Sequence, residues 1–344
     1  MEAYRNIIVR MPNWLGDAVM ATPVLADLRH HFPDAAITAM CKKNVGLLLK
    51  EDPHIDEIFS FERPSGWIHR RKHLEIIQPL RQGEFDLGIL LTNSWSSALW
   101  FYRGNVKELV GYADNFRSPL LTKAVRYSKK KERQHLVTTY KELLQPLGIP
   151  LSTTSPQLYL QSDELAWAKN FLKRMGIETD KHKIIGINPG AAYGSAKCWL
   201  PERFVQVSKK LLEDPQVRIV YFGDAAGAPL VDSICSKLPK EVINLAGKTS
   251  IRELMALLKC CAVLLTNDSG PMHIAAALAT PLLALFGSTN EVKTGPNPQG
   301  EVIHKHVECS PCYKRTCPID FRCMTRIESD EVVETLRKIV EENE

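Results

Sequence analysis

The residues best suited to chemistry lie in two glycine-containing turns, and the first is the segment TNDSGPMH at positions 266–273. Asp268 or Ser269 can cap a helix whose first turn contains Pro271. The backbone N–H groups at the start of such a helix have no partner within the helix, so they suit a phosphate group. Gly270 lets a ligand approach the backbone closely. A capped helix that binds no ligand explains the same residues equally well.

Two charged side chains could complete a phosphate site beside this turn. Lys197 follows a predicted strand at 183–188 and can neutralise phosphate oxygens as a point charge. Asp224 follows a predicted strand at 217–222 and could accept a hydrogen bond from a ribose hydroxyl. A helix N-terminus contributes only ~0.3–1 kcal/mol, up to ~2 when partly buried, so a diphosphate also needs the lysine. His273 could reach the same ligand. The simpler interpretations are that Lys197 is a solvated loop residue and that His273 is buried and hydrogen-bonded.

The second turn places a carboxylate at the start of another helix. Asp17 follows Gly16, where the N-terminal dipole of the helix favours the charged form of the side chain. Such a carboxylate can accept a proton from an incoming hydroxyl group, and a general base contributes ~10²–10⁴ in rate. The more common role of aspartate here is to cap the helix, which leaves two interpretations of Asp17.

Basic residues gather in the first half of the chain, for example at positions 69–73, HRRKH. Clusters of this kind usually form a solvated face. Four basic residues could instead recognise a phosphorylated or carboxylated acceptor, because guanidinium groups match the geometry of such anions. These residues are Arg63, Arg70, Arg71 and Lys72. Few aromatic residues lie among them, so nucleic acid is the weaker interpretation.

Four of the nine cysteines form a dense cluster late in the sequence: Cys309, Cys312, Cys317 and Cys323. Four thiols so close in sequence could hold zinc, but the spacing lacks the second C-x2-C pair of common zinc ribbons. A packed loop of reduced thiols, or a disulfide formed after isolation, is the simpler interpretation. We therefore expect neither a metal nor another cofactor.

Predicted strands and helices alternate twice along the chain, and they would position these residues. A strand, a helix and a strand follow one another over 6–40, and the pattern restarts at 163 after a polar, turn-rich segment. Parallel α/β sheets bind ligands beyond the carboxyl ends of their strands. The sequence thus predicts an α/β protein with two Rossmann-like domains facing a central cleft. The expected domains are 1–155 and 156–327, with a final helix at 328–344 that can pack back on the first domain.

Composition and missing motifs narrow the classes of function. Hydrophobic residues make up 44% and charged residues 24% of the chain, as in a globular protein. No complete GxGxxG follows a predicted strand and no GxxxxGK[ST] occurs, so nicotinamide dinucleotide binding and P-loop chemistry lose their usual support. Nine cysteines, an odd number, and no recognisable secretion signal favour a reducing cytoplasm. The longest uncharged run is interrupted by Pro281 and Gly287, so we expect no membrane span.

Three blocks of sequence, in this order, resemble the lipopolysaccharide heptosyltransferases of glycosyltransferase family 9, most nearly the heptosyltransferase II type. They are MPNWLGDA at 11–18, NPGA at 188–191 with KCW at 197–199, and NDSGPMH at 267–273. The resemblance runs along essentially the whole chain. It implies a GT-B fold and the inverting transfer of L-glycero-D-manno-heptose from ADP-heptose. The acceptor would be an inner-core heptose attached through Kdo to lipid A.

The resemblance also implies roles for individual residues. Asp17 would be the catalytic base and Lys197 would contact the diphosphate. The donor-binding residues would be Asp268, Ser269, Gly270 and His273, with Asp224 as the nearest candidate for the ribose carboxylate, and the acceptor-binding residues would be Asn13, Arg63, Arg70, Arg71 and Lys72. The enzyme would act at the inner face of the cytoplasmic membrane as a peripheral protein. No Asp-x-Asp occurs in the chain, which fits catalysis without a metal ion.

Two alternatives stay open on the sequence alone. An epimerase or hydrolase of nucleotide sugars on the same scaffold would turn over the donor without an acceptor. A zinc-stabilised nucleic-acid-binding protein would use the basic clusters and the four clustered cysteines, and would retain DNA or RNA in a salt-dependent way. The heptosyltransferase interpretation expects ADP-heptose and a lipid A-linked oligosaccharide as partners, and no nucleic acid.

Overall fold

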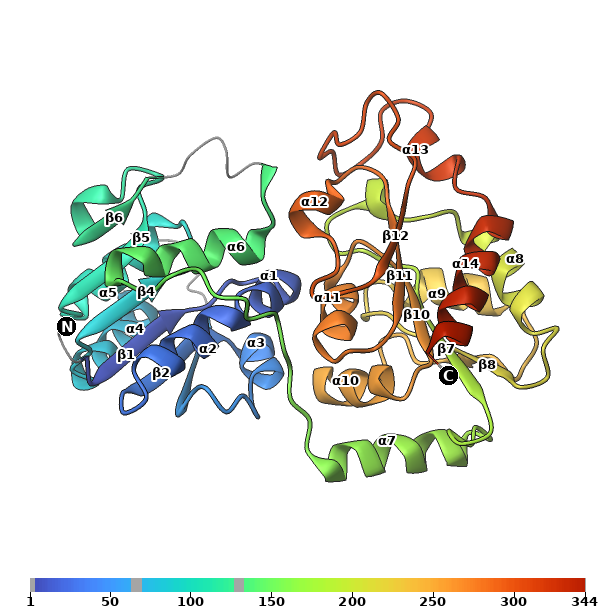
Figure 1. Cartoon of the computed structure of the whole chain (residues 1–344), viewed down its shortest axis with the longest axis horizontal. Helices are drawn as coiled ribbons and strands as arrows, with labels where there is room; N and C mark the ends of the chain where they lie inside the picture. Colours follow the sequence, from blue (N-terminus) through green and yellow to red (C-terminus); the bar gives the residue numbers. More distant parts are fainter. Residues whose placement is uncertain (1–3, 63–69, 127–132, 344) are drawn as a thin grey trace. The chain divides into compact units, whose positions relative to one another are not determined.

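The computed structural model describes residues 4–62, 70–126 and 133–343 and divides into two compact units (Figure 1). The units are Met1–Tyr159 and Leu160–Glu344, so the division falls at 159 and not at the expected 155. Each unit is built on a six-stranded sheet, and every strand pairing is parallel. Within the described ranges, every helix is too short or too polar to span a lipid bilayer.

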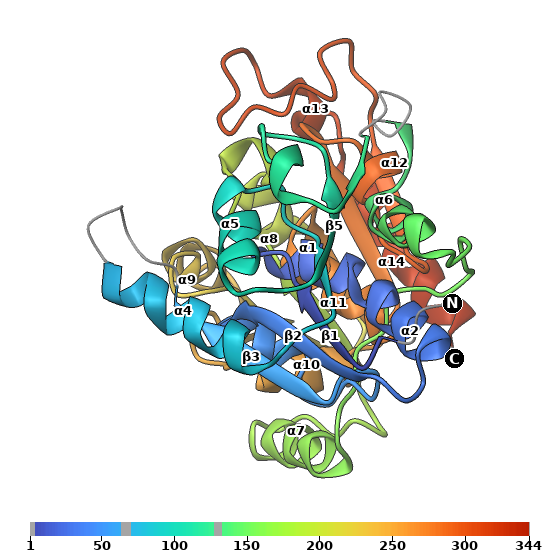
Figure 2. The ribbon, with the colours of Figure 1, turned by 90° about the vertical axis from the view of Figure 1, so that its left-hand side faces the viewer.

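The sheet of the first unit has the strand order β3-β2-β1-β4-β5-β6. Its strands are β1 (Asn6–Arg10), β2 (Ala36–Lys42), β3 (Glu57–Phe61), β4 (Leu87–Leu90), β5 (Glu108–Tyr112) and β6 (Lys123–Val125). Its helices are α1 (Leu15–Met20), α2 (Thr22–His31), α3 (Lys43–Leu48), α4 (Arg70–Gln82), α5 (Trp95–Arg103) and α6 (Leu136–Lys141). Helices α4 and α5 cover one face of the sheet, and α2 and α6 cover the other (Figure 2). The order reverses between β1 and β4, so the loops after these strands meet where such sheets bind ligands.

The helix expected from Ala18 onward is in fact two helices, α1 and α2. Pro23 lies at the start of α2; its ring has no N–H and clashes with the carbonyl four residues earlier, that of Val19. The Val19 carbonyl instead accepts a hydrogen bond from Thr22 Oγ1 at 2.9 Å. The break leaves α1 as a short helix of its own directly after the loop that follows β1.

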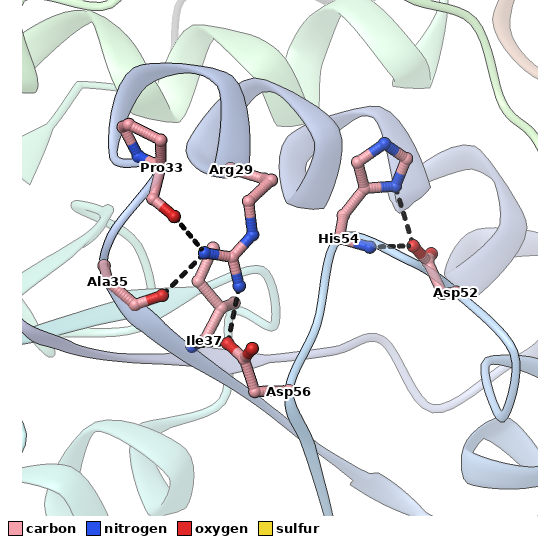
Figure 3. Close-up of polar contacts among 7 residues, drawn as sticks. All are labelled: Arg29, Pro33, Ala35, Ile37, Asp52, His54 and Asp56. Atoms are coloured by element: carbon pink, nitrogen blue, oxygen red, sulfur yellow. Dashed lines mark hydrogen bonds and ion pairs between the residues drawn. The ribbon is translucent and has the colours of Figure 1, made fainter.

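Polar contacts of Arg29 anchor the amino edge of this sheet (Figure 3). The guanidinium group, in the last turn of α2, donates to the carbonyl oxygens of Pro33 at 2.9 Å and Ala35 at 2.7 Å. It also contacts Asp56 Oδ2 at 2.5 Å, and the same oxygen accepts from the backbone N–H of Ile37 at 2.7 Å. These bonds join α2, β2 and the segment before β3, at the edge opposite to the loops that follow β1 and β4.

The sheet of the second unit has the order β12-β11-β10-β7-β8-β9. Its strands are β7 (Lys183–Asn188), β8 (Val217–Tyr221), β9 (Ile243–Asn244), β10 (Val263–Asn267), β11 (Leu282–Phe286) and β12 (Glu301–His304). Its helices are α7 (Ser162–Arg174), α8 (Pro201–Leu211), α9 (Ala228–Cys235), α10 (Ile251–Lys259), α11 (Gly270–Ala277), α12 (Glu291–Thr294), α13 (Arg322–Thr325) and α14 (Ser329–Glu342). The order reverses between β7 and β10, so the two units share one strand topology.

Helix α14 belongs to the second unit and lies along α8 (Figure 1). Val332, Leu336 and Ile339 are buried in the same apolar cluster as Phe204 of α8. The expectation that residues 328–344 pack back on the first domain therefore differs from the structure. The amphipathic pattern of this helix predicts one buried face, but it carries no information about which surface covers that face.

Candidate active site

The loops after β7 and β10 bring a charged pair together at the switch point of the second sheet. Lys197 Nζ lies 2.5 Å from Asp268 Oδ2, and the two side chains are only 13% and 5% exposed. The same carboxylate oxygen accepts a hydrogen bond from Thr289 Oγ1 at 2.6 Å. The sequence placed Lys197 and Asp268 at one sheet edge, and the structure adds that the carboxylate holds the lysine directly.

The start of helix α11 has no side-chain cap among the described residues. Ser269 is its N-cap residue, but within the described part of the chain its side chain caps no backbone N–H. Its hydroxyl instead contacts Thr266 Oγ1 at 3.0 Å and accepts from Asn188 Nδ2 at 3.2 Å. The first-turn N–H groups of α11, from Gly270 onward, therefore lack a side-chain acceptor at the N-cap. The expected capping by Ser269 is absent because the hydroxyl is used elsewhere.

A fully buried asparagine fixes the loop that carries Lys197. Asn267 Oδ1 accepts from the backbone N–H of Trp199 at 3.0 Å, and Asn267 Nδ2 donates to the carbonyl of Pro189 at 2.7 Å. Both ends of the loop are thus tied to the end of β10. Sequence reasoning missed this role, although an asparagine ending the apolar run of β10 was a usable signal, since buried amides need partners.

The segment around Arg315 also supports the loop that carries Lys197. A Cβ on Gly194 would lie 2.3 Å from the carbonyl oxygen of Arg315, so only glycine permits this approach. The same carbonyl accepts from the N–H of Ala196 at 3.0 Å. Lys197 Nζ and the Arg315 guanidinium lie 5.0 and 5.4 Å from the centroid of the Tyr193 ring, within range for cation–π attraction. The position of Lys197 is therefore set by several contacts.

The remaining donor-side candidates differ in exposure. His273 lies inside α11 and is 5% exposed. Asp224 is exposed beyond the end of β8, where its Oδ1 accepts from the backbone N–H of Gly227 at 2.7 Å. This bond shapes the turn that leads into α9. Asp224 thus lies at the carboxyl edge of the second sheet, as expected, and already accepts one hydrogen bond from the backbone.

In the first unit, Asp17 lies in the first turn of α1, directly after the loop that follows β1. The side chain is partly buried. Burial and, next, the charge of Asp17 raise the pKa of Tyr140, which belongs to α6. Asn13 in the preceding loop accepts a hydrogen bond at its Oδ1 from Arg10 Nη2 at 2.7 Å. Arg10 itself is buried at the end of β1, so this strand fixes the position of Asn13.

A buried arginine organises the neighbouring loop after β4, and sequence reasoning missed it. The Arg117 guanidinium donates to the carbonyl oxygens of Tyr112, at 2.8 Å, and Thr92, and to Asn93 Oδ1 at 3.1 Å. Burial lowers the pKa of Arg117 to about 10. An arginine in a polar loop carries no local signal that it is buried, because its partners lie far away in sequence.

Comparison with known proteins decides the family. The sequence profile of glycosyltransferase family 9 (heptosyltransferase) matches residues 73–321. The chain belongs to this family. Lipooligosaccharide heptosyltransferase 2 of Campylobacter jejuni is 27% identical over 343 residues, covering 97% of this chain and 98% of that protein. Lipopolysaccharide heptosyltransferase 2 of Escherichia coli K12 is 29% identical over 302 residues, covering 85% of each chain.

Structural similarity supports the same assignment. The structure of the E. coli ADP-heptose lipopolysaccharide heptosyltransferase II matches with a TM-score of 0.83 and 26% identity, covering 98% of this chain and 99% of that one. The predicted GT-B class and the predicted enzyme class, a glycosyltransferase, are confirmed. Membership of the heptosyltransferase family leaves the epimerase, hydrolase and nucleic-acid-binding alternatives without support.

The basic residues assigned to the acceptor lie at the start of α4 or before it. The segment Arg70 to Lys72 forms the first turn of this helix, while Arg63 lies outside the described residues. The helix packs through Ile76, Ile77 and Leu80 on the apolar cluster beside the sheet. Its first turn therefore extends from a firmly packed element, and the acceptor role of these residues in the heptosyltransferase stays a prediction.

The four clustered cysteines line one cavity of about 100 Å³, together with Ala196 and Ser288 of the loops around the Lys197–Asp268 pair. All four are free thiols, from exposed Cys309 to buried Cys323. Burial and the neighbouring thiols raise the pKa of Cys323. The cavity borders the lysine loop of the heptosyltransferase, and a role for its thiols, metal binding included, stays untested by this geometry.

Proposed function

We propose that this chain is an inverting heptosyltransferase that moves L-glycero-D-manno-heptose from ADP-heptose to an inner-core heptose of lipopolysaccharide, itself linked through Kdo to lipid A. The observation that carries the proposal is the largely buried Lys197–Asp268 pair beside the start of α11. A cation and uncapped N–H groups at the switch point of a parallel sheet suit the diphosphate of a sugar nucleotide.

In this proposal the second domain binds the donor. Lys197 and the N–H groups at the start of α11, around Ser269 and Gly270, hold the diphosphate. His273 lies beside them, and Asp224 accepts from a ribose hydroxyl. The resemblance implied that Asp268 binds the donor. We propose a different role, because a buried carboxylate would repel a phosphate at close range. We assign Asp268 as a positioning residue that holds Lys197.

The first domain would bind the acceptor and supply the base. Asp17 is the proposed base, Asn13 contacts the sugar, and the basic residues Arg63, Arg70, Arg71 and Lys72 face the anionic groups of the acceptor. The acceptor is part of a lipid, so the enzyme would work as a peripheral protein at the inner face of the cytoplasmic membrane. The polybasic segment at 69–73 favours this location, because anionic lipids attract polybasic segments.

The proposed reaction is a single displacement at the anomeric carbon. The acceptor oxygen forms the new bond while its proton passes to Asp17, and the bond between the anomeric carbon and the diphosphate oxygen breaks. The leaving ADP takes the electron pair, and Lys197 and the α11 N–H groups stabilise its developing negative charge. Attack from the face opposite the leaving group inverts the configuration. Protein cations provide the stabilisation, so this mechanism uses no metal ion.

Release of ADP from ADP-heptose, with and without a heptosyl-Kdo2-lipid A acceptor, tests the proposed function. We expect ADP release that depends on the acceptor and falls to background in the Asp17→Ala variant. Equal ADP release without the acceptor would instead identify a hydrolase. No release above the Asp17→Ala background, with folded protein and both substrates present, would reject glycosyl transfer by this chain.

Replacing Asp268 with asparagine tests its positioning role. The amide keeps an oxygen that can accept from Thr289 but loses the charge that holds Lys197. A displacement of a catalytic group by about 1 Å can cost ~10²-fold in rate, so we expect kcat to fall roughly 10–100-fold. Steady-state kinetics with the donor as varied substrate would measure this change, with Glu213→Gln as a control on an exposed acidic residue. A variant with normal kcat and only a lower free energy of unfolding would show that Asp268 is merely structural.

Binding to lipid vesicles tests the peripheral location. Each basic residue near an anionic surface contributes roughly 1 kcal/mol, so the Arg70→Ala/Arg71→Ala double variant should bind anionic vesicles about 30-fold more weakly. High salt should have the same effect on the wild type. The exposed pair Lys237 and Lys240 of the second unit provides a charge-matched control variant. Sedimentation with anionic vesicles that is unchanged by salt and by both arginine substitutions would contradict this location.

A further inference from the structure

A second cluster of chemistry-bearing side chains lies at the edge strand of the second sheet. Glu291 begins α12, His304 ends β12, and His306 follows two residues later. One ligand atom from each residue lies within 4.8 Å of the others, and in the described part of the chain this is the one such group of three. We propose that Glu291, His304 and His306 form a binding site for a divalent transition-metal ion such as Zn²⁺.

The hydrogen bonds of His304 define which ring nitrogen carries a proton. Ser310 Oγ donates its single hydrogen to the carbonyl of Gly287, so the same oxygen can only accept from His304 Nε2, at 2.8 Å. His304 Nε2 is therefore protonated. The other nitrogen, Nδ1, is then the ring atom available to a metal ion when it carries no proton.

The other ring nitrogen of His304 faces the Glu291 carboxylate. His304 Nδ1 lies 2.7 Å from Glu291 Oε2, and the His304 side chain is only 3% exposed. This is a hydrogen-bond distance, so a proton joins the two atoms in this structure. A metal ion would displace that proton and hold the two atoms somewhat further apart. A proton would satisfy this pair alone, whereas a metal ion would also use the third residue.

His306 supplies that third ligand. Its Nε2 lies 3.5 Å from the other carboxylate oxygen of Glu291, and its ring centroid lies 4.2 Å from that of His304. Its backbone has φ of 42°, in the left-handed region that non-glycine residues rarely adopt. Tetrahedral zinc with ligands at about 2.0–2.2 Å places those ligands about 3.3–3.5 Å apart, so small side-chain rotations would complete the site and leave one position for water.

The surroundings match a metal site in a further way. A histidine that binds a metal ion typically donates its other ring N–H to an oxygen, which fixes the orientation of the ring. His304 does this through Ser310. The site would join α12 to β12 and thereby fix the segment just after Thr289, whose hydroxyl holds Asp268. The metal ion would thus brace one side of the Lys197–Asp268 pair without entering the reaction.

Titration of the chelator-treated full-length protein with Zn²⁺ tests the proposal by calorimetry. We expect the wild type to bind Zn²⁺ at this site and the Glu291→Gln and His306→Ala variants to bind it at least 100-fold more weakly. Ser310→Ala, which removes only the orienting partner, should weaken binding ~10–100-fold. His30→Ala removes an exposed histidine of the first unit and serves as the control. The Glu291 side chain is partly exposed and the His306 side chain is mostly exposed, so their replacement should not prevent folding. Thermal unfolding of the metal-free variants would confirm that they fold.

The clustered cysteines also bind zinc in principle, so the test separates the two sites. The Cys309→Ser/Cys317→Ser variant should keep the Zn²⁺ affinity of this site, and the Co²⁺ adduct of that variant should show no thiolate-to-metal charge-transfer absorption. Loss of Zn²⁺ binding only in the cysteine variant would overturn the proposal. Undetectable Zn²⁺ binding by the wild type, or equal affinity in the wild type, Glu291→Gln and His306→Ala, would overturn it as well.

Discussion

The Asp17→Ala variant is expected to lose ~10²–10⁴-fold in kcat, the range that a general base contributes. Without the carboxylate, the acceptor hydroxyl must attack while it still carries its proton. The donor site lies in the other domain in this proposal, so KM for ADP-heptose should change little. Initial rates of ADP release at saturating acceptor, measured together with the thermal unfolding of the variant, would give both quantities.

An Asp17→Asn variant distinguishes a base from a helix-capping acid. Asparagine has nearly the same size and keeps a side-chain oxygen in the first turn of α1, but it cannot take up a proton. We expect Asp17→Asn to lose no more than the ~0.3–1 kcal/mol that a charge contributes in the first turn of a helix and to be nearly as inactive as Asp17→Ala. The exposed Asp34 gives a control substitution in the same unit. Wild-type activity in Asp17→Asn would show that the residue only stabilises α1.

Replacing Lys197 with alanine should lower kcat/KM ~10²–10³-fold, as removal of one group that stabilises a developing negative charge typically does. The lysine is proposed to neutralise the diphosphate both in the bound donor and in the leaving ADP, so ADP itself should also bind more weakly. Inhibition by ADP and steady-state rates would separate these effects. The matched control is Lys209→Ala, which replaces an exposed lysine of α8. Unchanged ADP affinity in Lys197→Ala would contradict the proposed contact with the diphosphate.

Loss of Lys197 also leaves the buried Asp268 carboxylate without its cation, so the single variant should be less stable. Breaking a buried pair on one side costs up to roughly 3–5 kcal/mol, whereas removing both charges costs much less. The Lys197→Ala/Asp268→Asn double variant should therefore regain most of the lost free energy of unfolding but no activity. Recovery of activity along with stability would show that Lys197 is needed only for folding.

The buried strands were the part of the fold most visible in the sequence. The predicted strand at 183–188 has the bounds of β7, and the one at 217–222 extends one residue past β8, because strands covered on both faces are largely apolar runs. Helix α5 and strand β12 were not anticipated, since polar and aromatic residues interrupt their patterns. The twofold α/β alternation was sufficient for two Rossmann-like domains, and the resemblance to the heptosyltransferases implied the GT-B class, which the comparison with a solved heptosyltransferase confirms.

The candidate site was predictable in its location but not in its contacts. Parallel strands bring their carboxyl ends to one edge, which placed Lys197 and Asp268 together although they are 71 residues apart. The pairing itself, the two bonds of Asn267 and the burial of Arg117 depend on side-chain packing between distant segments. The surface on which the final helix packs could not be inferred for the same reason, because an amphipathic face does not specify its partner.

Mass spectrometry of the product formed from ADP-heptose and a defined heptosyl-Kdo2-lipid A acceptor tests the proposed heptosyl transfer most directly. We predict that the acceptor gains the mass of one heptose in an amount equal to the ADP released, and that the Asp17→Asn protein forms no such product. An acceptor of unchanged mass beside released ADP and free heptose would contradict transfer and identify hydrolysis of the donor.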